Sequence, residues 1–250
     1  MYEAFFFGPE DLQLFGVYHP PIGSEQRVLT LICPPLFSEL NRSHGSLRKL
    51  AITLANAGHH VLRFDYVGTG DSFGDLDELA FADWEESIAI ALQEGRELSG
   101  CDKVRILGVR GSCPLVCRSV GDDPAVERFV FWDPILDGQQ YLENLRQGQI
   151  DAIEHHVHMS RADRDRIERS YCVYQMSKSM ENDFRALTAD TYASIPGDKL
   201  SVVKTTIDDD LPENTGRSEV VEFDCEWGVE SEEVIMCQPV LETLLTYLHK

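Results

Sequence analysis

The sequence is poor in basic residues and lacks a long apolar stretch. Its 250 residues include 22 Lys and Arg against 43 Asp and Glu, a formal net charge of −21. Because phosphates must be neutralised by a basic surface, we expect no nucleic-acid partner. No uncharged apolar run approaches the ~18 residues of a membrane span. Residues 1–7 lack the positively charged start of a secretory signal, so we expect a cytoplasmic protein without a membrane span.

Paired cysteines are also lacking. The seven cysteines form an odd set with no C-x-x-C pair. This pattern disfavours a disulfide framework and a zinc site, and it favours reduced thiols in the cytoplasm. We expect no metal and no cofactor.

Short apolar runs instead alternate with segments of helical periodicity. The runs predict strands at 27–33, 60–65, 103–108, 128–132, 200–204 and 219–223. The periodic segments predict helices at 46–57, at 84–98, after residue 108 and at 240–248. Strict alternation of strand and helix is typical of an α/β fold with a mostly parallel sheet flanked by helices.

Residues 138–195 differ from the rest because they contain no strand-like run. We expect a small helical cap there, inserted between two parts of the core domain at 1–137 and 196–250. Six scattered cations in this region favour an acidic partner protein, such as a carrier protein: Arg161, Arg164, Arg166, Arg169, Lys178 and Arg185.

Ligands of an open parallel sheet bind at the carboxyl ends of its strands. Four segments at these ends read P-P-x-x-x-E-x-N-R-S-H, R-F-D-Y-x-G-T-G-D-S-x-G-D, G-x-R and W-D-P-x-x-x-G-x-x-Y-L, and they begin at Pro34, Arg63, Gly108 and Trp132. With them the chain resembles the α/β-hydrolase superfamily over most of its length. It looks most similar to a bacterial group with Arg at the nucleophile elbow, described as exosortase-associated hydrolases or serine-aminopeptidase-like proteins. The resemblance implies an α/β-hydrolase fold and hydrolysis of an ester, thioester or other acyl group.

Two members of the usual Ser–His–Asp triad are missing from their expected positions. The elbow pattern G-x-S-x-G needs a central serine, and here the central residue is Arg110, which cannot act as a nucleophile. Ser112 stands at the last position of the pattern, where packing or capping is the better interpretation. The carboxylate is available, with Asp208 as one candidate, but residues 224–239 contain no histidine. The usual triad mechanism is therefore disfavoured.

Two interpretations of Arg110 remain open. It binds a small acyl or anionic ligand beside a helix N-terminus, or it forms an internal ion pair with Glu39 or Asp65. In the first, enzymatic interpretation, Leu36 and Gly111 supply backbone N–H groups of an oxyanion hole, and His44 or Glu39 acts as general base. Asn41 then lines the same pocket, although a capping or loop-bracing role at a helix start is the favoured interpretation of Asn41, Ser43 and His44. The second interpretation is a non-catalytic binding or partner protein.

Overall fold

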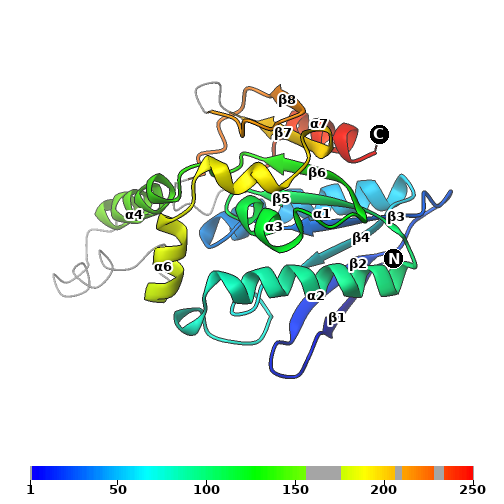
Figure 1. Cartoon of the computed structure of the whole chain (residues 1–250), viewed down its shortest axis with the longest axis horizontal. Helices are drawn as coiled ribbons and strands as arrows, with labels where there is room; N and C mark the ends of the chain where they lie inside the picture. Colours follow the sequence, from blue (N-terminus) through cyan, green and yellow to red (C-terminus); the bar gives the residue numbers. More distant parts are fainter. Residues whose placement is uncertain (1, 156–175, 206–209, 228–233, 250) are drawn as a thin grey trace.

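The described part of the chain forms one eight-stranded sheet with helices on both faces, as the computed structural model shows in Figure 1. The structure describes residues 2–155, 176–205, 210–227 and 234–249. The strands are β1 (Glu3–Phe7), β2 (Leu14–His19), β3 (Val28–Cys33), β4 (His60–Phe64), β5 (Lys103–Val109), β6 (Val126–Trp132), β7 (Leu200–Lys204) and β8 (Arg217–Val220). The helices are α1 (Ser38–Asn56), α2 (Phe81–Ser99), α3 (Ser112–Val120), α4 (Gly138–His155), α6 (Lys178–Arg185) and α7 (Gln238–His249).

The strand order is β1-β2-β4-β3-β5-β6-β7-β8. The first two strands form a hairpin that pairs antiparallel with β4, and every later pair is parallel. This arrangement confirms the expected α/β architecture. The carboxyl ends of β3, β5, β6 and β7 therefore meet at one edge of the sheet, where a ligand site of this architecture belongs.

Two apolar clusters fix the layers. Helices α1 and α7 pack on one face, where Leu50 and Leu244 bury their side chains against Val109 and Trp132 of the sheet. Helices α2 and α3 pack on the other face, where Trp84 and Leu115 lie among Leu31 and other side chains of the sheet. No helix among the described residues is long and apolar enough to cross a membrane.

Helix α1 begins eight residues earlier than the sequence predicts. The expected start was at residue 46, but the helix begins at Ser38 and includes Asn41 and His44. The buried face of its first turns is polar, with Glu39, Arg42, Ser43 and Ser46 all buried. A search for apolar residues at helical spacing cannot detect such a face, because the burial comes from tertiary contacts.

Other departures are smaller. No sequence expectation covered the hairpin of β1 and β2, and the last strand lies at 217–220 instead of 219–223. Between β6 and β7 the chain forms α4 and α6, and Phe184 of α6 is fully buried against Phe37 and Phe81. The boundaries of the helical cap stay a prediction. Four of its six cations, Arg161, Arg164, Arg166 and Arg169, lie outside the described residues.

Candidate functional site

The turn between β5 and α3 holds Arg110 in a conformation that favours glycine. Its φ is 54°, and its backbone N–H donates to the carbonyl oxygen of Trp132 at 2.9 Å. A positive φ at a non-glycine residue costs about 1–3 kcal/mol and persists only where the surroundings enforce it. Here the hydrogen bond to β6 helps to hold the turn. The geometry is that of a sharp strand-to-helix elbow with a guanidinium at its centre.

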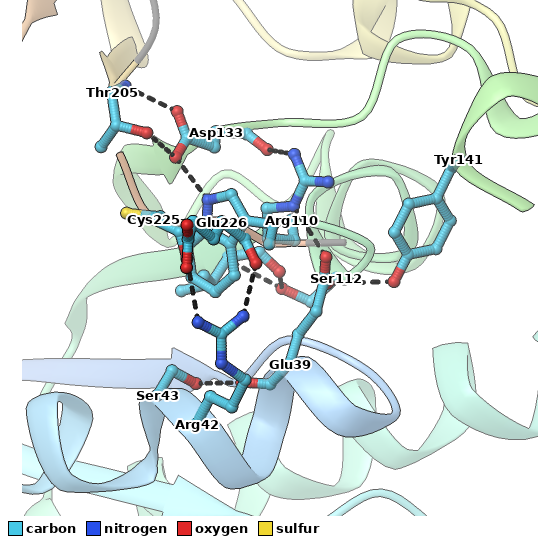
Figure 2. Close-up of polar contacts among 12 residues, drawn as sticks. Glu39, Arg42, Ser43, Arg110, Ser112, Asp133, Tyr141, Thr205, Cys225 and Glu226 are labelled. Atoms are coloured by element: carbon cyan, nitrogen blue, oxygen red, sulfur yellow. Dashed lines mark hydrogen bonds and ion pairs between the residues drawn. The ribbon is translucent and has the colours of Figure 1, made fainter. Parts of the chain in front are cut away.

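The side chain of Arg110 forms a buried ion pair with Glu39 (Figure 2). Its Nε lies 3.1 Å from Oε1 of Glu39, and its Nη1 donates to the carbonyl oxygen of Asp133 at 3.3 Å. The Glu39 side chain is 0% exposed and that of Arg110 is 15% exposed. The hydroxyl of Tyr141, on α4, donates to the other Glu39 oxygen at 3.0 Å. Both carboxylate oxygens of Glu39 are therefore engaged.

The aromatic rings of Tyr141 and Trp227 enclose the guanidinium. The Arg110 Cζ atom lies 5.7 Å from the Tyr141 ring centroid and 5.5 Å from that of Trp227. Cation–π attraction at such distances adds to the ion pair. The charge of Arg110 is thus stabilised from three sides.

Burial and charge oppose each other in this pair. Burial raises the pKa of Glu39. The charge of Arg110 and the hydrogen bonds from Arg110 and Tyr141 oppose this effect and lower the pKa. Burial alone would lower the pKa of Arg110, but Glu39, Tyr141 and Asp133 raise it above its ordinary value. Arg110 therefore stays charged, and a general-base role for Glu39 is unfavourable because both of its oxygens are occupied.

The Asp133 carboxylate holds the end of β7 and the loop at residues 225–227. It accepts hydrogen bonds from the Thr205 N–H at 2.8 Å, the Thr205 hydroxyl at 2.6 Å and the Trp227 indole N–H at 2.7 Å. Arg42 of α1 supports the same loop by donating to the carbonyl oxygens of Cys225 and Glu226 (Figure 2). These contacts hold the Trp227 ring over Arg110.

A cavity of about 250 Å³ lies beside Arg110. It is lined by Pro134–Asp137 after β6, by Gln140, Tyr141 and Asn144 of α4, and by Lys204 and Asp210. The guanidinium donates hydrogen bonds through Nε and Nη1. Within the described residues Nη2 of Arg110 has no hydrogen-bond partner. The cavity therefore offers a fixed positive charge with one unused donor edge.

Ser112 is buried and fully engaged in the turn. Its hydroxyl lies 2.9 Å from the carbonyl oxygens of both Cys33 and Val109, and it accepts the Val109 N–H at 2.7 Å. These bonds tie the ends of β3 and β5 to the start of α3. Cys113 beside it is also fully buried, and burial raises the pKa of its thiol, so no thiolate is available there.

Leu36 and Gly111 lie against each other near the elbow. A Cβ atom on Gly111 would lie only 2.7 Å from Cδ1 of Leu36. In the described part of the chain, the backbone N–H groups of both residues have no hydrogen-bond partner. They stay candidates for an oxyanion hole.

Other candidates lie elsewhere. Asn41, His44 and Asp65 line a different cavity, together with Arg63 and Asp71. Because Glu39 and His44 are five residues apart on α1, their side chains leave the helix on different faces. Asp208 lies outside the described residues. The structure therefore brings Arg110 together with Glu39, Leu36, Gly111 and Ser112, and it separates this group from His44.

Tyr141, Asp133 and Lys204 were not predicted from the sequence as residues of the site. Tyr141 and Asp133 stand inside the W-D-P-x-x-x-G-x-x-Y-L segment, so the signal for two of them was present. The segment predicts a strand end but gives no indication of which side chain turns back toward Arg110. Lys204 ends a plain strand, and its sequence offers no such signal.

Comparison with solved structures identifies the architecture. The chain matches proline iminopeptidase from Mycobacterium smegmatis with a TM-score of 0.61 at 11% identity, covering 99% of this chain and 98% of that one. It matches a putative lipase from Acinetobacter baumannii AYE with a TM-score of 0.55 at 13% identity, covering 81% and 74% of the two chains. The chain has the α/β-hydrolase fold.

The similarity reaches no further than the fold. An alpha-beta serine hydrolase homologue from Coxiella burnetii is 22% identical with a TM-score of 0.45, and the match covers 53% of this chain and 62% of that one. No protein-family model and no curated protein matches the sequence. The residues of the site must therefore decide the function.

Proposed function

We propose that this α/β-hydrolase-fold protein is a cytoplasmic binding protein that does not catalyse Ser–His–Asp hydrolysis and that holds a small carboxylate-bearing acyl ligand beside Arg110. The observation that carries the proposal is the ion pair of Arg110 with the fully buried Glu39 at the elbow. A permanently protonated guanidinium replaces the nucleophile there.

The chemistry of the cavity supports an anionic acyl ligand. The unused Nη2 edge of Arg110 is a donor at this cavity, and α3 begins two residues later with the positive end of its dipole. Ile135 and Leu136 supply apolar wall for an acyl chain. A carboxylate at Arg110 with its chain along this wall satisfies both features. The six described cysteines are free and buried, which suits a reducing compartment.

The alternative assigns the ion pair a purely structural role. Arg110 then only joins the β5–α3 turn to α1, and the cavity takes no ligand. The two possibilities differ in one measurable property, namely whether an acyl carboxylate binds at the cavity rim.

A substitution that introduces a negative charge at Gln140 tests the proposal. Isothermal titration calorimetry measures the binding of sodium hexanoate to the wild type and the variant. Gln140 is exposed, lines the cavity and belongs to α4. We expect Gln140→Glu to weaken hexanoate binding by roughly five- to tenfold, because the added negative charge repels the carboxylate of the ligand. Gln139→Glu places the same charge on the neighbouring exposed position and should leave binding unchanged. Absence of saturable hexanoate binding to the wild type, or equal effects of the two variants, would favour the structural alternative.

A further inference from the structure

A second cavity, of about 300 Å³, lies between α1 and the hairpin side of the sheet. The polar side chains that face it are Asn41 and His44 of α1, Arg63 of β4, and Asp65 and Asp71 of the turn after β4. All five belong to the motif segments that begin at Pro34 and Arg63, and the site at Arg110 uses none of them. We propose that this cavity binds a small apolar α-amino acid as its zwitterion.

Opposite charges lie at the polar end of the cavity without forming a direct ion pair among the described residues. Arg63 of β4 and Asp65, which directly follows the strand, both line the cavity. Their charges influence one another's pKa, yet in the described part of the chain no N–O distance of 4.0 Å or less joins Arg63 to Asp65 or Asp71. A ligand with an ammonium beside the two carboxylates and a carboxylate beside the guanidinium would pair with the charges of both signs.

The protein leaves donors and acceptors of these groups unused. Nε of Arg63 donates to His19 Nε2 at 3.4 Å, and among the described residues its two Nη atoms have no partner. One Asp65 oxygen, Oδ2, accepts the Asp71 N–H at 3.2 Å, while Oδ1 has no partner within the same residues. Burial is the main cause that lowers the pKa of His44, so its imidazole is neutral at pH 7 and provides a donor or an acceptor without charge.

The turn after β4 is shaped to present Asp65. Gly70 has a φ of 55°, and a Cβ atom there would lie 2.2 Å from Oδ2 of Asp65. Only glycine allows the chain to close this tightly on the carboxylate. The Ser72 hydroxyl donates to the Asp65 carbonyl oxygen at 2.7 Å and completes the turn.

The remaining wall of the cavity is apolar. Phe15 and Val17 of β2 face it from one side, and Leu40 and Leu47 of α1 face it from the other. A cavity with a polar, doubly charged end and an apolar remainder fits a ligand with the same division. An aliphatic amino acid such as leucine has a carboxylate and an ammonium at one end and a branched chain at the other.

Isothermal titration calorimetry with three ligands separates the zwitterion from its halves. The ligands are L-leucine, 4-methylpentanoate, which lacks the ammonium, and 3-methylbutylamine, which lacks the carboxylate. We expect leucine to bind and each half-ligand to bind at least tenfold more weakly. Equal binding of leucine and either half-ligand would overturn the zwitterion assignment. Absence of saturable leucine binding at about 10 mM would overturn the site itself.

Matched variants locate the binding. Asp71→Asn should weaken leucine binding at least fivefold, whereas Asp75→Asn removes a charge from the same exposed turn outside the cavity and should have no effect. Arg63→Gln should weaken leucine and 4-methylpentanoate together. Gln140→Glu should leave leucine binding unchanged, so failure of this site is distinguishable from failure of the site at Arg110. Equal effects of Asp71→Asn and Asp75→Asn would contradict the location.

Discussion

Replacing Arg110 with methionine is expected to lower the free energy of unfolding by about 3–5 kcal/mol, because Glu39 would remain as a buried carboxylate without a cation. Methionine keeps a long side chain at the same φ, so the change isolates the charge. Urea denaturation followed by far-UV circular dichroism measures the loss.

The companion change at Glu39 provides the control. In the Glu39→Gln/Arg110→Met double variant neither charge is buried, and the amide still accepts the Tyr141 hydroxyl. We expect the double variant to be more stable than Arg110→Met alone. With Glu39→Gln measured as the other single variant of the cycle, the coupling energy should be about 2 kcal/mol or more. A loss of unfolding free energy below about 1 kcal/mol for Arg110→Met is within the range of an exposed ion pair. It would contradict the assignment of a buried, stabilising ion pair between Arg110 and Glu39.

The same variant has a predictable pH dependence. Burial raises the pKa of Glu39, and without Arg110 no cation among the described residues lowers it. A carboxyl group whose folded-state pKa lies above its unfolded value destabilises the fold progressively as pH rises through that folded-state pKa. The stability difference between wild type and Arg110→Met should therefore be larger at pH 8 than at pH 5.

Replacing Asp133 with asparagine is expected to cost about 2–4 kcal/mol of unfolding free energy. The Asp133 carboxylate accepts from three donors, and an amide replaces one acceptor oxygen with an NH₂ group that faces them. Asparagine tolerates the positive φ of 46° at this position, so backbone strain does not contribute. Depending on the orientation of the amide, either the Trp227 indole N–H or the Thr205 backbone N–H loses its acceptor, so the loop at 225–227 or the end of β7 should loosen. Urea denaturation gives the stability, and tryptophan emission reports the loop.

Asp137→Asn is the matched control for this prediction. Asp137 is exposed in the same loop, and its side-chain oxygen caps the N–H of Gln140 at 2.9 Å, a role that asparagine also fulfils. We expect a change below about 0.5 kcal/mol. Similar losses for Asp133→Asn and Asp137→Asn would show that the buried acceptor contributes nothing beyond a surface carboxylate.

The sheet was predictable because its strands are nearly continuous apolar runs. Residues 200–204 are a strand in both the prediction and the structure, and the other core strands differ by one or two residues at an end. The N-terminal hairpin of β1 and β2 was not predicted. The last strand is exposed at every position, so its boundaries have no apolar pattern to define them.

The sequence predicted the ion-pair partner of Arg110 only as a choice between Glu39 and Asp65. Two carboxylates were candidates, and the ion pair forms with Glu39. Which of the two it would be depends on the start of α1, which a polar buried face conceals. For the same reason His44 was grouped with Arg110, although the helix turns it toward the other cavity. Contacts between elements far apart in the sequence, such as that of Tyr141 on α4 with Glu39 on α1, can be found only from the tertiary structure.

Hydrolysis of a panel of short acyl esters and thioesters by wild type, Arg110→Ala and His44→Ala tests the central claim most directly. The claim is that an elbow occupied by a charged, paired arginine supplies no nucleophile. We expect all three proteins, with folding verified by circular dichroism, to show only the uncatalysed rate, while an ordinary serine esterase turns over the same panel. Turnover by the wild type that is lost in Arg110→Ala or His44→Ala would contradict the account and establish a non-serine hydrolase.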